Sequence, residues 1–234
     1  MTPERWTATT QYINALFGQE DEPLRGLMAR AVQDGLPDIA VDAGTGRVLS
    51  LLCAMTNSGR GAKVAIEVGT LAGYSAIWIA RALAPGGRLY TIEAEPKHAA
   101  FARRMFVEAG VSDRVEVIEG KGLDVLPALI NTLAQTPTVD FVFLDAVKTE
   151  YPAYFDQIAT SIRPSGLLVA DNTLGSGRWW IDALDPGLTG AARAEAEASR
   201  RAADELCRTL AGDPRFESAM IPIREGLLVG RRRA

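Results

Sequence analysis

The sequence has very little histidine and cysteine. Its 234 residues include one histidine, His98, and two cysteines, Cys53 and Cys207. The cysteines lie far apart and form no C-x-x-C pair, so neither a disulfide scaffold nor a zinc site is indicated. A Ser/His/Asp triad could be assembled only through His98, and we do not expect hydrolase chemistry of that kind. We expect both cysteines to be buried free thiols in a reducing compartment.

The sequence also lacks a basic excess and any long apolar run. Its formal net charge is −4 at pH 7, whereas nucleic-acid-binding proteins usually carry a basic excess or a clustered basic face. We interpret the one basic run, Arg231-Arg232-Arg233, as a solvated tail. No stretch approaches the ~18 apolar residues of a membrane span, and the first residues lack the pattern of a signal peptide. We therefore predict a cytoplasmic protein with neither a membrane nor a nucleic acid as its partner.

Hydrophobic residues make up 47% of the chain. This is enough to bury a substantial core, and we interpret residues 1–234 as one domain. Between Pro3 and about Ser58, apolar residues spaced by three and four predict helices, interrupted by a loop at Gly35–Asp42. We expect the helices within residues 1–58 to contribute to a substrate site or to a dimer interface.

Beyond this region, apolar and β-branched segments alternate with helical patterns. Such alternation is typical of an α/β fold, a doubly wound and mostly parallel sheet covered by helices on both faces. Two strands that follow the last parallel strand predict an antiparallel hairpin at the sheet edge. The predicted strands are 64–68, 88–92, 115–118, 141–145, 167–170, 216–221 and 226–230, and the predicted helices are 75–83, 96–109, 122–133, 154–162 and 191–210.

A glycine turn between the first predicted strand and its helix is the most informative motif. The apolar run Val64–Val68 contains Glu67 and continues into Gly69-Thr70-x-x-Gly73. Glycines let a ligand come close to the backbone, while a carboxylate accepts hydrogen bonds from ribose hydroxyls or an ammonium group. Dinucleotide folds use G-x-G-x-x-G instead, and here Leu71 stands at the middle glycine. The motif therefore favours S-adenosylmethionine over a nicotinamide dinucleotide.

Acidic residues stand at or near the ends of the five predicted parallel strands. Ligands bind at this edge of open parallel sheets, and crowded carboxylates are costly there unless ligands or cations use them. Glu93 could accept two hydrogen bonds from a ribose diol, although a turn or helix-capping role before Pro96 is the alternative. The five positions are Glu67, Glu93, Glu119, Asp145 and Asp171.

Asp145, Asp171 and Asn172 form a second group, at two neighbouring strand ends. Two carboxylates and one amide oxygen suit a hard divalent cation, Mg²⁺ first and Mn²⁺ or Ca²⁺ as alternatives. An Asp-Asn pair alone is more often a turn, and it is the additional Asp145 that favours a metal site. Lys148 is a candidate general base, because a nearby dication and a partly dry cleft disfavour its charged form. A surface lysine is the alternative.

Trp179 and Trp180 follow the flexible Gly175-Ser176-Gly177 segment. They could form a wall that stacks on a planar substrate, or one of them could pack in the core. The sequence leaves both roles open.

Five segments form a specific set in this order and spacing: Glu67-Val68-Gly69-Thr70-x-x-Gly73-Tyr74-Ser75, Tyr90-Thr91-Ile92-Glu93, Phe143-Leu144-Asp145-x-x-Lys148-x-x-Tyr151, Asp171-Asn172 and Asp213-Pro214-Arg215. Together they resemble the cation-dependent O-methyltransferases, the family of catechol and caffeoyl-coenzyme A O-methyltransferases and many small bacterial enzymes. The resemblance runs from about Gly46 to the C-terminus. It implies a Rossmann-like class I methyltransferase fold, with a doubly wound seven-stranded sheet and a reversed C-terminal hairpin.

The resemblance also implies roles for individual residues. Asp145, Asp171 and Asn172 would hold the cation, and Lys148 would take the proton from an acceptor that chelates the cation through two adjacent oxygens. Val147 departs from the family pattern, since many bacterial members have an acid there. The residues implied for S-adenosylmethionine are Val41, Glu67, Gly69, Thr70, Ser75, Glu93, Gly122 and Asp145, with Glu93 on the ribose hydroxyls and Gly122 behind the adenine.

We therefore expect an S-adenosylmethionine-dependent, cation-assisted O-methyltransferase that acts on a small vicinal dihydroxy molecule similar to catechol. The resemblance implies a homodimer. O-methylation of a modified nucleoside in transfer RNA is an alternative, which the acidic charge balance disfavours. A cofactor-binding protein without catalysis is another alternative. Lys148 and the metal-binding residues argue against it, because such crowded charges have no structural purpose.

Overall fold

The computed structural model describes residues 3–133 and 138–234. By their contacts the residues divide into two compact units, Met1–Lys121 and Gly122–Ala234, while the expected single domain stays a prediction. The elements of the first unit are α1 (Pro3–Phe17), α2 (Leu27–Gln33), α3 (Ala43–Gly59), β1 (Val64–Val68), α4 (Tyr74–Arg81), β2 (Arg88–Glu93), α5 (Pro96–Glu108) and β3 (Val115–Glu119).

The second unit continues the alternation of helices and strands. Its described elements are α6 (Gly122–Thr132), β4 (Val139–Leu144), the 3₁₀ helix η1 (Lys148–Glu150), α7 (Tyr151–Ile158), β5 (Ile162–Ala170), β6 (Gly175–Ser176), β7 (Trp179–Trp180), β8 (Ala183–Leu184), α8 (Gly190–Gly212), β9 (Phe216–Ile221) and β10 (Leu227–Arg232).

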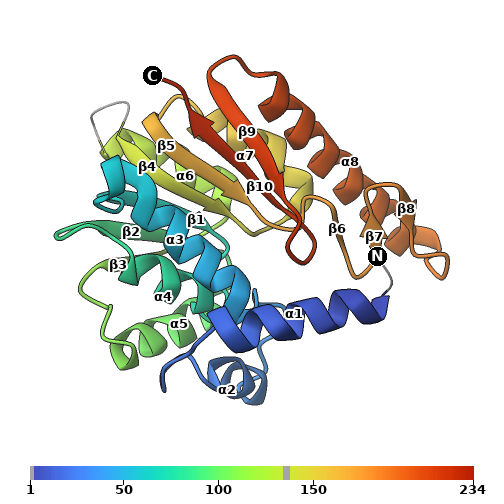
Figure 1. Cartoon of the computed structure of the whole chain (residues 1–234), viewed down its shortest axis with the longest axis horizontal. Helices are drawn as coiled ribbons and strands as arrows, with labels where there is room; N and C mark the ends of the chain where they lie inside the picture. The colour runs from blue at the N-terminus through green and yellow to red at the C-terminus, as the bar shows by residue number, and fades with distance from the viewer. Residues whose placement is uncertain (1–2, 134–137) are drawn as a thin grey trace. The chain divides into compact units, whose positions relative to one another are not determined.

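Seven of these strands form one sheet, in the order β3-β2-β1-β4-β5-β10-β9 (Figure 1). The pairs β1–β2, β2–β3 and β4–β5 are parallel. Strand β10 runs antiparallel to both β5 and β9. The predicted α/β class, the mostly parallel seven-stranded sheet and the reversed C-terminal hairpin are therefore confirmed.

In the first unit, the strand register places the acidic strand ends at one edge. The pairing of β1 with β2 runs from Val64↔Arg88 to Val68↔Ile92, and β2 pairs with β3 up to Glu93↔Glu119. Helix α5 begins with a proline in its first turn, where the missing N–H costs nothing. The chain after β1 turns sharply into α4, and this turn requires Gly73, as shown below.

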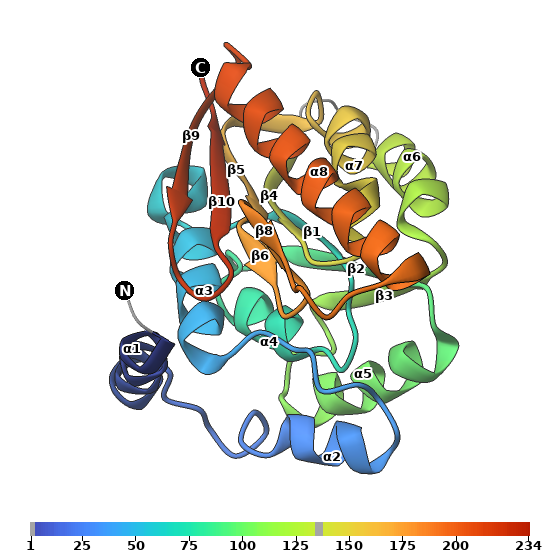
Figure 2. The same ribbon diagram turned by 90° about the vertical axis from the view of Figure 1, so that its right-hand side faces the viewer.

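In the second unit, β4 is buried along its whole length. Figure 2 shows α6, α7 and α8 side by side along one face of β4, β5 and β10. Continuous burial explains why β4 is apolar from Phe141 to Leu144, while the buried Asp140 near its start is paired with Arg163. The strand ends at Leu144, so that Asp145 is the first residue beyond it.

Two predicted elements in this unit have wrong bounds. The helix predicted for 154–162 is α7, which begins at Tyr151 with Pro152 in its first turn and ends at Ile158. Strand β5 begins at Ile162, five residues before the predicted start. The β4–β5 register jumps from Val139↔Ile162 to Phe141↔Leu167, so the intervening Pro-Ser-Gly residues form a bulge within the strand. Proline and glycine indicated a loop there.

The segment between β5 and α8 contains a small antiparallel sheet, β6-β7-β8, which the sequence pattern did not indicate. Trp179 is buried against Ala196 and Ala203 of α8. Trp180 is 40% exposed, and a Cβ atom on Gly175 would lie 2.2 Å from its ring. One tryptophan therefore packs in the core, and Trp180 lies over a glycine with part of its ring in solvent.

The N-terminal helices leave several apolar side chains in solvent. Tyr12, Leu16 and Phe17 of α1 are exposed, as are Leu51 and Met55 of α3. Their expected part in a dimer interface stays a prediction. None of the helices in the described part of the chain combines the length and apolar character needed to cross a membrane. Both cysteines are free thiols, as predicted, but Cys207 is only partly buried.

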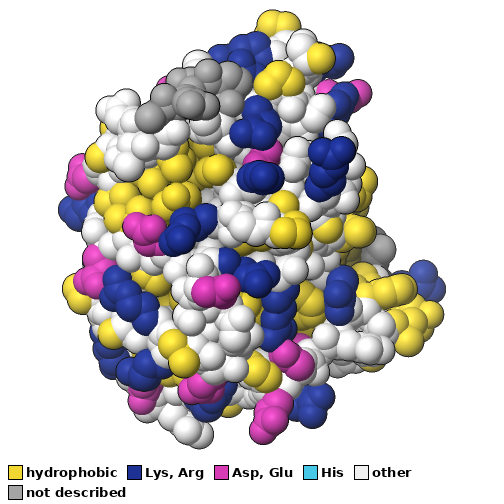
Figure 3. Space-filling model, turned by 90° about the vertical axis from the view of Figure 1, so that its left-hand side faces the viewer, with side chains coloured by type: hydrophobic (Ala, Val, Ile, Leu, Met, Phe, Trp, Pro, Cys, Tyr) yellow, Lys and Arg dark blue, Asp and Glu magenta, His cyan; other side chains and the backbone are white. Residues whose placement is uncertain are grey.

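Charged side chains of both signs are interspersed on the face that Figure 3 shows. Several pairs link separate elements of the first unit at the surface, each worth at most about 1 kcal/mol. Three of them have nitrogen–oxygen distances of 2.6 Å: Arg30–Glu108, Arg103–Glu119 and Arg104–Asp34.

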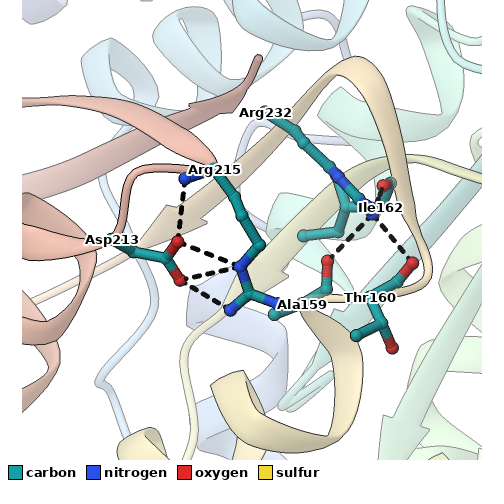
Figure 4. A network of polar contacts seen from close by, with 6 residues as sticks. All are labelled: Ala159, Thr160, Ile162, Asp213, Arg215 and Arg232. Atoms are coloured by element: carbon teal, nitrogen blue, oxygen red, sulfur yellow. Dashed lines mark hydrogen bonds and ion pairs between the residues drawn. The ribbon is translucent and has the colours of Figure 1, made fainter. Parts of the chain in front are cut away.

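The three C-terminal arginines are not a solvated tail, contrary to the prediction. Arg231 pairs with Glu217 across the β9–β10 hairpin at 2.7 Å. Nη1 of Arg232 donates to the carbonyls of Ala159, Thr160 and Ile162, which follow the C-terminus of α7 (Figure 4). Arg233 donates to the Phe216 carbonyl. Carbonyls beyond a helix C-terminus lack intrahelical donors, and the last strand supplies them.

We expect Gly73→Ala to destabilise the protein more than Gly110→Ala. Both glycines have positive φ, so either alanine adds left-handed strain of about 1 kcal/mol. Only at Gly73 would the new Cβ also lie 2.5 Å from Phe106, whereas Gly110 has open space. Urea denaturation should give a loss of ~2–4 kcal/mol for G73A and ~1 kcal/mol for G110A. Equal losses would mean that Phe106 moves aside and that the turn does not depend on this close approach.

Candidate functional site

Glu67 near the end of β1 is a fully buried carboxylate. Its Oε1 accepts a hydrogen bond from Ser75 Oγ and its Oε2 accepts one from Thr91 Oγ1, both at 2.6 Å. Thr91 donates its single proton to Glu67, so the 2.5 Å contact between Thr91 and Thr70 hydroxyls must be donated by Thr70. Hydroxyls of α4 and β2 thus bond this buried carboxylate directly, and Thr70 of the glycine turn bonds Thr91 behind it.

The glycine turn after β1 is held by Glu93, at the end of β2. Glu93 Oε2 accepts the backbone N–H groups of Thr70 and Leu71, at 3.2 and 2.7 Å. Its Oε1 accepts from Glu95 N–H and lies 3.5 Å from His98 Nδ1. The turn N–H groups, which a phosphate-binding turn would offer to its ligand, are here occupied by a carboxylate. Glu93 thus has a role in the turn, which was the alternative to the predicted binding of ribose.

Backbone strain accompanies this turn. Gly69, Leu71 and Gly73 all have positive φ, and Leu71 does so without being glycine, at 49°. Gly69 N–H donates to the Ile92 carbonyl at 3.0 Å, which ties the turn to β2. A leucine in this region costs of order 1 kcal/mol, and its hydrogen bond to Glu93 helps to hold it there.

Val41 and Gly122 are placed in different units. Val41 is 5% exposed and precedes Asp42, the N-cap of α3, whose carboxylate accepts Thr45 N–H at 2.8 Å. Asn14 of α1 donates to Asp42 and accepts from Gly44 N–H, so α1 is fastened to this N-terminus. Gly122 is buried at the start of α6. Contact of either residue with a cofactor stays a prediction.

In the second unit, the structure brings Asp145, Lys148 and Tyr151 together. Lys148 Nζ donates to Asp145 Oδ1 at 2.7 Å and to Tyr151 Oη at 2.8 Å. The Tyr151 hydroxyl in turn points its proton at the Leu144 and Asp171 carbonyls, 2.9 and 3.0 Å away. A single buried phenol thereby connects Lys148 to the ends of β4 and β5. The sequence placed Tyr151 in a motif but did not indicate a role for it.

The charge state of Lys148 differs from the expectation. Burial lowers its pKa, but the Asp145 and Asp171 carboxylates and the Tyr151 hydroxyl outweigh burial and raise it above the ordinary value. The ammonium form is therefore favoured here. Burial does lower the pKa of Lys148, as predicted, but the adjacent carboxylates raise it by more.

Asp171 is a buried carboxyl with an unusual environment. It is 2% exposed, and its Oδ1 has no hydrogen-bond partner among the residues that the structure describes. Burial, reinforced by Asp145, raises its pKa to about 7, against the lowering effect of Lys148 and Arg224. An unpaired carboxylate oxygen in such a place is costly unless a proton or a cation binds it.

This environment fits a hard divalent cation. Asp145, Asp171 and the amide of Asn172 offer oxygen ligands at the ends of β4 and β5. Asn172 follows directly in a left-handed conformation, φ 54°, which asparagine tolerates better than most residues. No group of three or more histidine, cysteine, aspartate or glutamate side chains in the described ranges could hold a metal. The set predicted from the sequence, two carboxylates and one amide, contains only two such side chains and stays a prediction.

The comparisons with known proteins agree with one family. The sequence model of the O-methyltransferase family matches residues 15–233. The chain is 38% identical to a catechol O-methyltransferase of Niastella koreensis over 194 residues, 82% of this chain and 85% of that protein. It is 39% identical to a catechol O-methyltransferase of Mycobacterium tuberculosis over 166 residues, 71% of each chain.

Solved structures give the same result. The O-methyltransferase TomG of Streptomyces achromogenes, determined in complex with SAM, has a TM-score of 0.82 and 33% identity over the full length of both chains. An O-methyltransferase of Bacillus cereus, in complex with SAH, has a TM-score of 0.82 and 31% identity, covering 98% of this chain and 99% of that one. The chain belongs to the O-methyltransferase family.

Proposed function

We propose that this protein transfers a methyl group from S-adenosylmethionine to a hydroxyl of a small vicinal dihydroxy molecule, with the help of a divalent cation. One observation carries the proposal. Lys148 is held by a carboxylate and a phenol at the end of β4, and the same phenol contacts the buried Asp171, whose Oδ1 is unpaired among the described residues. A candidate base and an oxygen ligand for a cation are the groups that such a reaction needs.

The cofactor part of the proposal rests on the first unit. Glu93 occupies the N–H groups of Thr70 and Leu71, so the glycine turn does not present them to a pyrophosphate. A carboxylate oxygen can accept more than one hydrogen bond, so Glu93 Oε1, which accepts Glu95 N–H, can also accept from a hydroxyl or ammonium group of S-adenosylmethionine. Relatives of at least 31% identity were solved with SAM and SAH. These features support S-adenosylmethionine and oppose a nicotinamide dinucleotide.

The chemistry needs one proton transfer and one methyl transfer. Lys148 Nζ, in its neutral form, accepts the proton of the acceptor hydroxyl. The oxygen lone pair then forms the bond to the methyl carbon, while the carbon–sulfur bond breaks and its electron pair passes to sulfur, which leaves S-adenosylhomocysteine. A divalent cation on Asp145, Asp171 and Asn172 would lower the pKa of the acceptor hydroxyl and offset the carboxylate charges that raise the pKa of Lys148. Tyr151 keeps Lys148 Nζ in place.

The acceptor is proposed from relatives and from the ligand set. Two relatives are named catechol O-methyltransferases, and adjacent hydroxyls match a cation that keeps coordination positions open. Methylation of a nucleoside in transfer RNA has less support, because the net charge is −4 and the charges in Figure 3 are interspersed rather than gathered into a basic surface on that face. A homodimer in the cytoplasm remains part of the proposal.

The direct test combines cofactor binding with cation-dependent turnover. Calorimetry should give one-site binding of S-adenosylhomocysteine and no response to NAD. Methyl transfer from labelled S-adenosylmethionine to 3,4-dihydroxybenzoate should vanish in EDTA and return with Mg²⁺. Asp145→Asn should lower turnover by about 10²-fold or more, whereas Asp113→Asn, at a surface position that is 74% exposed, should not. A folded sample that binds no S-adenosylhomocysteine, or turnover that EDTA leaves unchanged, would contradict the proposal.

Asp171 should make stability depend on pH in a definite direction. Its pKa is raised from 3.8 to about 7, so the folded protein keeps a proton that the unfolded chain has lost. That contribution is present below about pH 4 and is lost as pH rises through 7. In EDTA, wild type should therefore lose roughly 2–3 kcal/mol relative to Asp171→Asn between pH 5 and pH 8.

Urea denaturation of both proteins at the two pH values measures this difference. Mg²⁺ added at pH 8 should stabilise wild type and leave D171N unchanged. A wild-type-minus-D171N difference that does not vary with pH would mean that Asp171 is already ionised in the folded protein at pH 5.

Tyr151→Phe should lower kcat with little change in the affinity for S-adenosylhomocysteine. The variant loses the hydroxyl that holds Lys148 Nζ, and a misplaced base costs roughly 10–100-fold. Tyr154→Phe is the matched control, since Tyr154 is a buried tyrosine of the same helix whose hydroxyl bonds Glu150 instead. Steady-state kinetics that give the same kcat for both variants would exclude a positioning role for Tyr151.

A further inference from the structure

The turn between β9 and β10 contains an arginine in a strained conformation. Arg224 has φ 46°, a left-handed value that favours glycine. Gly226 N–H bonds the Ile223 carbonyl at 2.8 Å, so Arg224 is the first central residue of a tight turn. At this position a positive φ is dominated by glycine, asparagine and aspartate. The turn itself therefore does not explain an arginine.

Hydrogen bonds fasten this turn to the segment that follows Asp171. Thr173 donates to the Gly226 carbonyl with both its N–H and its hydroxyl, each at 3.1 Å. Leu174 N–H donates to the Glu225 carbonyl at 2.8 Å. Thr173 is only two residues beyond Asp171 and is fully buried. The turn that carries Arg224 is thus fastened to the chain two residues beyond Asp171, a proposed ligand of the cation.

The guanidinium of Arg224 has unused hydrogen-bonding capacity. Its side chain is 23% exposed and its nearest acid is the adjacent Glu225, with 3.3 Å between Nε and Oε2. Nη1 of Arg224 and Oε2 of Glu225 are both buried without a hydrogen-bond partner in the described part of the chain. The pair is therefore a loose contact, in which neither partner fulfils its hydrogen-bonding potential.

Two arginines near the ends of the same hairpin have purely structural roles. Arg215 makes a bidentate pair with Asp213, and Arg232 donates to three carbonyls that follow α7 (Figure 4). Both use their donors on the protein itself. Lys148 likewise directs two of its three donors at the protein, toward Asp145 and Tyr151. Arg224 differs from the two arginines, because its buried Nη1 has no hydrogen-bond partner among the described residues.

We propose that Arg224 forms an anion-binding subsite next to the Asp145–Lys148–Asp171 cluster and selects methyl acceptors that carry a carboxylate. A guanidinium matches the planar, two-oxygen geometry of a carboxylate. A phosphate dianion fits less well, because Glu225 already places a carboxylate oxygen 3.3 Å from Nε of the one guanidinium. This inference rests on the proposed function, since it names the class of dihydroxy acceptor.

The test compares an acidic acceptor with its neutral counterpart. The kcat/KM values for 3,4-dihydroxybenzoate and 3,4-dihydroxybenzamide are measured for wild type, Arg224→Gln, Glu225→Gln and Arg208→Gln. We expect wild type to prefer the acid roughly 10- to 100-fold, as charge-assisted hydrogen bonds would give. The ratio should fall toward one in R224Q. It should rise in E225Q, which loses a competing carboxylate, and stay at the wild-type value in R208Q, which removes one charge at an exposed arginine paired with Asp204.

A second variant separates loss of recognition from loss of fold. Arg224→Gly relieves the left-handed strain, so its melting temperature should equal that of wild type or exceed it by roughly 2–4 °C. Its acid preference should nevertheless be lost. A wild-type ratio near one, or an R224Q ratio equal to that of wild type, would overturn the proposal.

Binding distinguishes failure of the subsite from failure of the proposed function. If wild type methylates neither acceptor, the proposed function fails, and calorimetric titration of the acid and the amide in Mg²⁺ and S-adenosylhomocysteine tests the subsite alone. Tighter binding of the acid that is lost in R224Q supports Arg224. Equal binding of the two compounds, or binding of neither, overturns it.

Discussion

The structure depends on how carboxylates are buried at the ends of its strands. A charge taken out of water must find partners that replace its hydration, and the acids at the strand ends differ in the partners they find. Glu67 receives two hydroxyls, Glu93 receives backbone N–H groups, and Asp145 receives an ammonium. Asp171 has a carboxylate oxygen that no described residue satisfies. This series distinguishes acids whose oxygens accept donors from the protein from an acid with an oxygen left for a proton or a cation.

The acids of the first unit and those of the second unit differ in the same way. In the first unit the acids are neutralised by dipoles and hydrogen-bond donors, so they fix the shape of the glycine turn with no need for a cation. In the second unit they compete for a single ammonium, and Tyr151 links that ammonium to both strand ends. The carboxylates raise the pKa of Lys148 even though its burial opposes this. A base in such surroundings needs another positive charge to offset the carboxylates, and this is the physical reason for the cation that we propose.

Much of the fold could be predicted because its signals are local. The apolar runs of β1 and β4, the proline that opens α5 and the glycines after β1 depend on neighbouring residues alone. The start of β5 could not be predicted, since Pro164 and Gly166 indicate a loop and only pairing with β4 places Ile162 in a strand. The direction of the Lys148 pKa shift also depends on tertiary contacts. Burial lowers the pKa and nearby carboxylates raise it, and only the folded structure shows that the carboxylates have the larger effect. Similarly, the C-terminal arginines look solvated until the end of α7 is seen beside them.

Arg224 illustrates a different limit. Its sequence context, Pro222-Ile223-Arg224-Glu225-Gly226, indicates a turn and nothing more. The functional signal is a combination of three properties that appear only in three dimensions: positive φ, an unpaired buried nitrogen, and hydrogen bonds that connect the turn to Thr173. A strained backbone and an unsatisfied donor both reduce stability. Arg224 has both, and neither helps to hold the fold together. Where such costs coincide beside a cluster of reactive groups, recognition of a ligand is the benefit that can offset them.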